Sequence, residues 1–215
     1  MKSHSERVPN KNIKPIAGKP CFHWIVETLS KSKYIKEIVI NTDSEEIARS
    51  AKENFNVKVL KRPGFLLGDM VSIQPLIEYD LSKTNGEYYL QTHSTNPLVT
   101  TETIDRAIEV FFAQNEHDTL FTVTPTKTRF YWSDGTGINH DPKHLIRTQD
   151  LEPIYEENSC LYIFSKTTNK KTKNRLGLNP MMFPMERLEA ADIDDIEDFY
   201  WAEYLLLRKQ KNEGK

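Results

Sequence analysis

Apolar residues recur at helical spacing directly after Pro20, which predicts a helix with one buried stripe starting there. The stripe consists of Cys21, Trp24, Ile25, Thr28 and Leu29. A short β-rich run at 38–40, a helical pattern at 44–54 and an apolar run at 57–60 follow it. This succession of strand, helix and strand predicts parallel strands joined by right-handed crossovers.

The alternation continues with a helix at about 72–83, a strand at 88–91, a helix from about Ile104 to Phe112 and a strand at 119–124. It predicts a Rossmann-like, three-layer α/β/α fold with a mostly parallel sheet. The polar loop at 92–97 directly follows a strand. Ligands of open α/β sheets bind at the carboxyl ends of strands, so this loop is a candidate binding site.

The regular pattern stops between residues 125 and 157, where prolines, glycines and aromatic residues show no helical period. We expect hairpins that project from the sheet. Such an excursion either carries a subunit interface, covers a site, or is only a long decorated loop. A strand at 159–164 and a helix ending near Leu207 resume the pattern. We therefore expect one α/β domain, residues 1–124 and 158–215, with residues 125–157 inserted as a hairpin excursion.

The composition limits the class of function. The chain has 215 residues, 38% of them hydrophobic, and a formal net charge of −2. This balance argues against nucleic acid or an anionic membrane as the partner. No apolar run has transmembrane length, no secretory signal is visible, and Cys21 and Cys160 lie in apolar runs, so we expect a reduced, cytoplasmic protein. The basic run 170–175 is most simply the solvated end of a helix.

The first residues form a candidate anion site. Segment 2–12 is polar, with Lys2, Arg7 and Lys11 among hydroxyl and amide side chains. Hydroxyls and backbone N–H groups can surround phosphate oxygens while basic side chains neutralise their charge. Taken by itself, the segment is more simply explained as a solvated, frayed terminus.

An acidic segment near the C-terminus is open to two interpretations. Asp192 and Asp194 are two positions apart, so on an extended chain their carboxylates project to one side and could share a cation. Alternatively, Asp194 caps the final helix and Glu197 completes a capping box. On spacing alone, capping is the more common case.

Short motifs along nearly the whole chain resemble those of the acylneuraminate cytidylyltransferases, also called CMP-sialic acid synthetases. They are Ser5-x-Arg7-x-Pro9-x-Lys11-Asn12, Gly18-Lys19-Pro20, Asn41-Thr42-Asp43, Arg62-Pro63 followed by Asp69, Asn96-Pro97-Leu98, Glu157-Asn158 leading into Tyr162-Ile163, and Asp192-Ile193-Asp194 followed by Asp198. No single motif is specific. Their order along the chain matches that of the family.

The resemblance implies roles for particular residues. The implied nucleotide site consists of Lys2, Ser5, Lys11, Asn12, Arg62, Asp69 and Ser72. The implied sugar site consists of Gln91 or His93, because the loop after this strand aligns with the family in two ways, together with Arg147, Gln149, Asn158 and Tyr162. Asp192 and Asp194 match the family's magnesium-binding aspartates, which reverses the preference for capping.

The implied reaction joins CTP and a 2-keto-3-deoxy nonulosonic acid, giving a CMP-sugar and pyrophosphate. The anomeric 2-hydroxyl attacks the α-phosphorus in line, magnesium on Asp192 and Asp194 lowers the pKa of that hydroxyl, and Lys11 and Arg7 hold the triphosphate. The candidate catalytic residues are Lys11, Arg7 and Asp192. A homodimer formed through the excursion is also implied. The alternatives are a Kdo-type or other sugar nucleotidyltransferase, and a non-catalytic nucleotide-sugar-binding module.

The sequence departs from the family at its beginning. Lys2 stands where the family has an arginine, and Arg7 stands near its glycine. The family also has a hydrophobic strand ahead of this loop, at the centre of the sheet, whereas this sequence begins on the loop. We therefore expect the first central strand to be absent and its neighbours unpaired. Either the natural start lies upstream, or this version is unstable or inactive.

Overall fold

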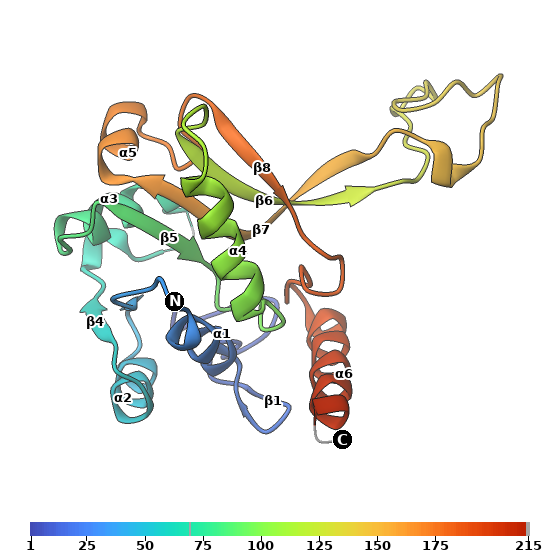
Figure 1. Cartoon of the computed structure of the whole chain (residues 1–215). Coiled ribbons are helices and arrows are strands. Elements are labelled where there is room, and N and C mark those ends of the chain that lie inside the picture. The colour runs from blue at the N-terminus through green and yellow to red at the C-terminus, as the bar shows by residue number, and fades with distance from the viewer. Residues whose placement is uncertain (69, 214–215) are drawn as a thin grey trace.

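The computed structural model describes residues 1–68 and 70–213 and has an α/β fold (Figure 1). The helices are α1 (Cys21–Lys31), α2 (Glu45–Asn54), α3 (Ile73–Ser82), α4 (Thr101–Phe112), α5 (Lys166–Thr172) and α6 (Ile196–Glu213). The strands are β1 (Pro15–Ile16), β2 (Lys19–Pro20), β3 (Val39–Thr42), β4 (Lys58–Lys61), β5 (Tyr88–Thr92), β6 (Thr119–Thr126), β7 (Ile154–Ser165) and β8 (Pro180–Pro184). Single turns of 3-10 helix lie at Gly64–Leu66 and Thr148–Asp150.

Side-chain caps fix where two of the predicted helices begin. The Ser44 hydroxyl accepts a hydrogen bond from the backbone N–H of Ile47 at the start of α2, 3.2 Å away. The Thr100 hydroxyl accepts one from the N–H of Thr103 at the start of α4, also 3.2 Å away. Each cap satisfies a backbone donor that has no partner within its helix, so both helices begin close to the predicted positions.

The main sheet has four strands in the order β5-β7-β6-β8. β7 is antiparallel to both β5 and β6, while β6 and β8 are parallel. The expectation of a mostly parallel sheet is therefore wrong, because β7 returns from the excursion beside β6 and runs against its neighbours. β8 was not expected as a strand, since Pro180 and Pro184 frame it, but as an edge strand it tolerates proline.

Both faces of the main sheet are covered, which gives three layers. Leu161 and Ile163 of β7 pack in a core with residues of α1 and α4. Tyr162 and Phe164 point to the opposite face and pack with α3. This alternation follows from the two-residue period of a strand. A third cluster joins α6 to the N-terminal segment through buried residues such as Val8.

β3 and β4 form a separate, parallel two-stranded sheet. Between β3 and β5 lies a cavity of about 1340 Å³, lined by residues of both strands and of α1 and α3. The edges of β3 and β5 that border this cavity are not paired with each other in the part of the chain that the structure describes. The cavity therefore divides one α/β layer into two sheets.

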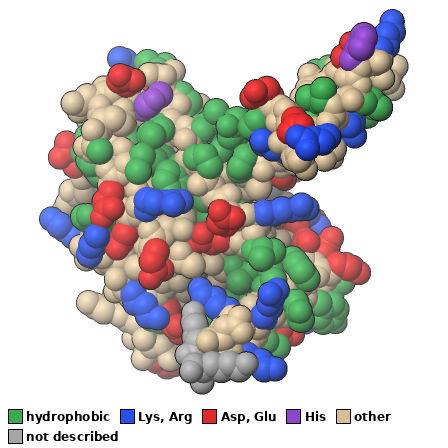
Figure 2. Space-filling view, turned by 45° about the vertical axis from the view of Figure 1, so that its right-hand side comes forward, with side chains coloured by type: hydrophobic (Ala, Val, Ile, Leu, Met, Phe, Trp, Pro, Cys, Tyr) green, Lys and Arg blue, Asp and Glu red, His purple; other side chains and the backbone are tan. Residues whose placement is uncertain are grey.

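The chain between β6 and β7 projects from the sheet as an arm, residues 127–153 (Figure 1). Figure 2 shows a hollow between this arm and the body, with basic side chains along the lower side of the arm. Large apolar side chains on the arm are exposed, among them Tyr131, Trp132, Leu145 and Ile146. No other part of the described chain covers this apolar surface of the arm.

Two findings bear on the expected compartment. Cys21 and Cys160 are free and buried, as predicted. Among residues 1–68 and 70–213, no helix is both long and apolar enough to cross a membrane.

Candidate active site

The N-terminal segment is folded against the body and is not a frayed terminus. Val8 is fully buried against the α6 cluster. The backbone N–H and the hydroxyl of Ser3 donate to the two carboxylate oxygens of Asp43, at 2.7 and 2.8 Å, just beyond the end of β3. A turn at Asn10, whose φ is 56°, reverses the chain so that Lys11 points back toward the acidic segment.

This segment and the loop after β5 enclose a cleft of about 360 Å³. Its walls include the predicted site residues Lys2, Ser5, Arg7, Lys11, Asn12 and His93, together with His4, Ser94 and Thr95. Basic and hydroxyl groups therefore meet at the carboxyl end of β5, where an α/β sheet places its ligands.

Asn12 ties the two walls of the cleft together. Its side-chain oxygen accepts a hydrogen bond from the Ser94 hydroxyl at 2.6 Å, and its amide nitrogen donates to the Lys2 carbonyl at 3.0 Å. Asn12 is buried, so these bonds fix the loop as well as the side chain. The structure gives Asn12 a positioning role within the predicted nucleotide site.

The acidic segment lies directly beside this loop. The Ile193 N–H donates to the Thr95 carbonyl at 3.0 Å, and the Ile193 carbonyl accepts a hydrogen bond from the Lys11 ammonium. Arg7 and Asp194 form an ion pair with a 2.6 Å contact between Nη2 and Oδ1. Residues 187 positions apart in sequence are thus brought together, and both predicted basic residues face the predicted metal segment.

The helix cap is one residue later than the capping alternative placed it. The Asp195 carboxylate accepts from the N–H of Asp198 at 2.9 Å, and the Asp198 carboxylate accepts from the N–H groups of Asp194 and Asp195 at 3.0 and 3.1 Å. Asp195 and Asp198 are therefore the reciprocal pair, and the Asp194–Glu197 assignment is wrong. The carboxylates of Asp192 and Asp194 therefore take no part in this cap, although Asp194 is paired with Arg7.

The carboxylates of Asp192 and Asp194 suit a magnesium ion. The protein around the Asp192 carboxyl raises its pKa by excluding water, and the neighbouring Asp194 charge raises it further, although a hydrogen bond from Thr95 opposes both. A divalent cation would relieve this cost. Residues 1–68 and 70–213 contain no group of three or more His, Cys, Asp or Glu side chains arranged to hold a metal ion. Magnesium commonly uses one or two carboxylates and completes its shell with water and phosphate oxygens, so two suffice.

Arg62 lies in a buried network behind the cleft. Its Nε donates to the Asn41 side-chain oxygen at 2.9 Å, and Nη2 to the Asn41 carbonyl at 3.3 Å. It lines the larger cavity between β3 and β5. Ser72, at the start of α3, makes no capping bond with its side chain. Asp69 lies outside the described residues.

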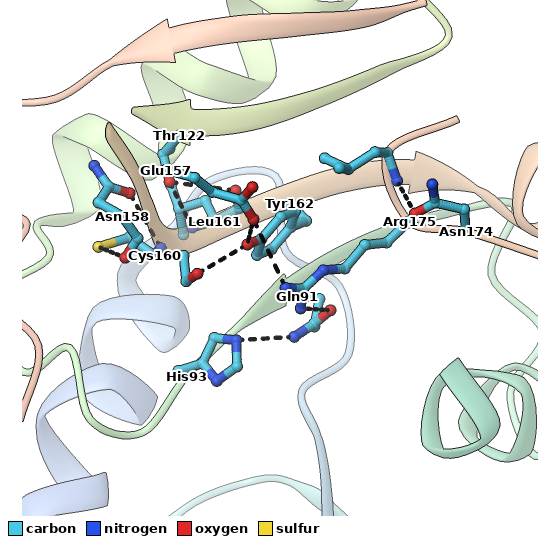
Figure 3. Close-up of polar contacts among 12 residues, drawn as sticks. Gln91, His93, Thr122, Glu157, Asn158, Cys160, Leu161, Tyr162, Asn174 and Arg175 are labelled. Carbon is cyan, nitrogen blue, oxygen red and sulfur yellow. Dashed lines mark hydrogen bonds and ion pairs between the residues drawn. The ribbon is translucent and has the colours of Figure 1, made fainter. Parts of the chain in front are cut away.

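A second polar cluster adjoins the cleft at β5 and β7 (Figure 3). Gln91 and His93 point the same way from β5, and Gln91 Nε2 lies 3.2 Å from His93 Nε2. Tyr162 of β7 donates its hydroxyl proton to Glu157 and is 3.0 Å from the Ser159 hydroxyl. Arg175 lies over the Tyr162 ring. The sequence interpretation missed Arg175, because it ends a basic run that is otherwise typical of a solvated helix end.

Asn158 belongs to an irregular part of β7. The pairing with β6 shifts register between Phe121 and Val123, and Ser159 has a φ of 57°. This bulge lets the Asn158 amide donate to the Thr124 hydroxyl at 3.1 Å.

Arg147 and Gln149 are not in the cleft of their own chain. Both lie on the arm, which carries them away from the sheet (Figure 1). Arg147 forms a bidentate contact with Asp150, at 2.7 and 3.1 Å, and is largely exposed.

Comparisons with known proteins identify the family of the chain. The family model described as cytidylyltransferase matches residues 1–212. The chain is 29% identical to the post-translational flagellin modification protein B of Campylobacter coli, covering 97% of this chain and 92% of that one. It is 26% identical to a pseudaminic acid cytidylyltransferase of Campylobacter jejuni, covering 94% and 91%. It is 25% identical to an N-acylneuraminate cytidylyltransferase of Escherichia coli, covering all of this chain and 52% of that protein.

Solved structures share the fold. A CMP:2-keto-3-deoxy-manno-octonic acid synthetase complexed with CTP is similar with a TM-score of 0.69 at 12% identity, covering 97% of this chain and 96% of that one. A 4-diphosphocytidyl-2C-methyl-D-erythritol synthase of Anaerococcus prevotii is similar with a TM-score of 0.67 at 13% identity, covering 95% of each. The resemblance expected from the motifs is confirmed: the chain belongs to the cytidylyltransferase family and is a nucleotidyltransferase.

Proposed function

We propose that this enzyme transfers CMP from CTP to a nonulosonic acid of the pseudaminic or sialic type and releases pyrophosphate. The observation that carries the proposal is the meeting of the basic loop with the acidic segment, through the Lys11 and Arg7 contacts, at the carboxyl end of β5. The names of the similar proteins from Campylobacter and Escherichia coli supply the sugar class.

The residues of the cleft would act by positioning and electrostatics. Lys11 and Arg7 would exchange their present partners, the Ile193 carbonyl and Asp194, for triphosphate oxygens. The anomeric hydroxyl of the sugar loses its proton to solvent and its oxygen forms a bond to the α-phosphorus, while the bond from that phosphorus to pyrophosphate breaks. The basic side chains offset the charge that the leaving group gains. Lys2 and Ser5, on the same wall, would complete the phosphate contacts.

We propose that magnesium binds at Asp192 and Asp194. Both are hard oxygen donors on one extended segment, and neither caps α6. Bound there, the ion would supply Lewis acidity that favours ionisation of the sugar hydroxyl. Arg7 would leave Asp194 for the triphosphate as the ion arrives.

We propose a homodimer in which the arm of each subunit reaches the other's site. Two observations support it: the exposed apolar side chains of the arm, and the projection of the arm, which carries Arg147 and Gln149, away from the sheet in Figure 1. In a symmetric pair, the same surface of both subunits is buried, which would cover this apolar surface. Arg147 would then contact the sugar bound to the partner subunit.

We also propose that one β-strand completes the sheet between β3 and β5. The cavity of about 1340 Å³ between their unpaired edges supports this, as does its apolar lining from Ile40, Leu90 and Ile163. A strand there would pair backbone groups on both sides and stiffen the support of the N-terminal loop.

The free, buried thiols agree with a reducing compartment, and we place the reaction in the cytoplasm.

The test is pyrophosphate release from CTP and magnesium in the presence of pseudaminic, N-acylneuraminic and 2-keto-3-deoxyoctonic acids in turn. We expect turnover with a nine-carbon acid at least about tenfold above that with the eight-carbon acid. A pocket that fits one sugar acid makes fewer contacts with another, and this difference in contacts sets the ratio of rates. Turnover with the eight-carbon acid alone would support a Kdo-type enzyme. No turnover with any acid, even in a version with a strand supplied to the gap, would support a binding module.

A further inference from the structure

Arg175 is held in a defined pose beside the cleft, although no role has been assigned to it. Its side chain is only 16% exposed. Its Cζ lies 3.5 Å from the centre of the Tyr162 ring, and its Nη1 donates to Gln91 Oε1 at 3.0 Å (Figure 3). Stacking on one face and a hydrogen bond at one edge fix the guanidinium plane.

The charge of Arg175 is poorly compensated by the protein. Within the described chain, the ion pair recorded for Arg175 is with Glu157, and the two atoms are 3.9 Å apart. The same Glu157 oxygen already accepts the Tyr162 hydroxyl proton. Burial lowers the pKa of Arg175, although Tyr162 and Glu157 act in the opposite direction. A partly buried guanidinium with one distant acid bears a desolvation cost that an anionic ligand would offset.

The cluster connects directly to the cleft through β5. Gln91 contacts Arg175 through its oxygen and His93 through its nitrogen, and His93 lines the cleft with Lys11. Burial lowers the pKa of His93 to about 4, and the charges of Arg175, the N-terminal ammonium and Lys11 add to this effect. His93 is therefore neutral near pH 7, and the charged side chains at the two ends of this path are the cations Arg175 and Lys11. A ligand reaching from the cleft to Arg175 would carry a negative group at that end.

We infer that Arg175 binds the carboxylate of the sugar acid, with Gln91 and Tyr162 holding its guanidinium in place. This inference rests on the proposed function. The planar fork of a guanidinium matches a carboxylate in two parallel hydrogen bonds, a geometry that a lysine ammonium does not reproduce. Lys11 and Arg7 already provide for the triphosphate on the other side of His93, so the two anionic groups of the substrates would have separate basic partners.

The test compares Arg175→Met and Arg175→Lys with Arg106→Met. Arg106 is a matched control, since its guanidinium also lies over a ring, 5.0 Å from the centre of Phe183, but outside the cleft. KM for the sugar acid should rise at least about tenfold in Arg175→Met and less in Arg175→Lys, in keeping with the loss of a charge-assisted hydrogen bond. KM for CTP should change by less than about twofold, and Arg106→Met should match the wild type for both substrates.

A second substrate separates carboxylate binding from a merely structural role. The wild type should prefer the sugar acid to its carboxamide, and Arg175→Met should lose that preference. Equal losses with the acid and the carboxamide, or a parallel rise in KM for CTP, would overturn the inference. If Arg175→Met fails to fold, Arg175→Gln, which also removes the charge but keeps a polar group, serves the same comparison. A wild type that stays inactive even with a strand supplied to the gap would instead contradict the proposed function.

Discussion

Asp194 and Asp195 are adjacent, yet their carboxylates have different partners. Asp194 is exposed and paired with Arg7, whereas Asp195 accepts the Asp198 N–H at the start of α6. Exposed ion pairs contribute little to stability, while a helix cap contributes about 1 kcal/mol. Neighbouring substitutions therefore distinguish the metal site from the cap.

We predict that Asp194→Asn and Asp192→Asn each lower the rate at least about tenfold, because each removes a charged magnesium ligand. Their Tm should stay close to that of the wild type. Asp195→Ala should lower the free energy of unfolding by about 1 kcal/mol and keep most of the activity. Rates at several magnesium concentrations and thermal melting of all three variants provide the measurement. Full activity in Asp192→Asn and Asp194→Asn would contradict the metal assignment.

The burial of His93 predicts how the stability of the folded protein depends on pH. Its pKa falls from 6.5 in the unfolded chain to about 4 in the folded one, mainly through burial. Above pH 6.5 both states are neutral; as pH falls from 6.5 toward 4, only the unfolded state gains the proton, so stability is lost across that window and no further below it. His93→Asn should reduce this loss by at most about 3 kcal/mol.

Denaturant unfolding at pH 7, 5.5 and 4.5 measures this effect. His144→Asn is the control, since the His144 side chain is 84% exposed on the arm. Identical pH dependence in His93→Asn and the wild type would show that His93 does not titrate as its burial implies.

The sequence predicted the cleft residues better than the cluster behind them. The family motifs contain Lys11, Asn12 and Asp192, and the fold brings all three to one place. Arg175 could not be predicted, because its role depends on β7 placing Tyr162 beneath it, a contact between residues of different elements. The cap is Asp195 and not the expected Asp194, because the cap lies one residue later than expected. Spacing alone does not locate a helix boundary to within one residue.

Among the elements, helices and most strands follow from local pattern, but strand direction and pairing do not. The period of apolar residues predicted α1 and α4. β7 was predicted as a strand, but its antiparallel place between β5 and β6 depends on the arm that precedes it. β8 was missed because two prolines obscure a short edge strand.

The gap between β3 and β5 leads to a prediction about the thermal stability of the sheet. A five-residue segment rich in Val and Ile, fused ahead of Met1 at the gap, should raise Tm by about 5 °C or more by pairing both edges. A Gly/Ser segment of the same length is the control. Hydrogen exchange should slow at the backbone amides of β3 and β5 only with the apolar segment. Equal Tm values for both fusions would contradict a strand-accepting gap.

We propose that the protein works as a dimer. Mixing two variants, each damaged at a different residue of the proposed site, tests this. If the arm serves the partner's site, an Arg147→Ala subunit paired with an Asp192→Asn subunit has one complete site and one doubly damaged site. Random exchange should then restore roughly a quarter of wild-type activity, given twofold symmetry. If Arg147 acts within its own chain, the mixture should stay inactive. Light scattering should give the mass of a dimer, and a monomer would contradict the proposal.

The central claim is the transfer of CMP to the anomeric oxygen of a nonulosonic acid. Mass spectrometry and phosphorus NMR of the product formed from CTP, magnesium and pseudaminic or N-acylneuraminic acid test it most directly. We expect one CMP-sugar with a single phosphodiester signal, together with equimolar pyrophosphate. A product that contains a diphosphate, formed only when the acceptor is a sugar phosphate or a polyol phosphate, would contradict this reaction.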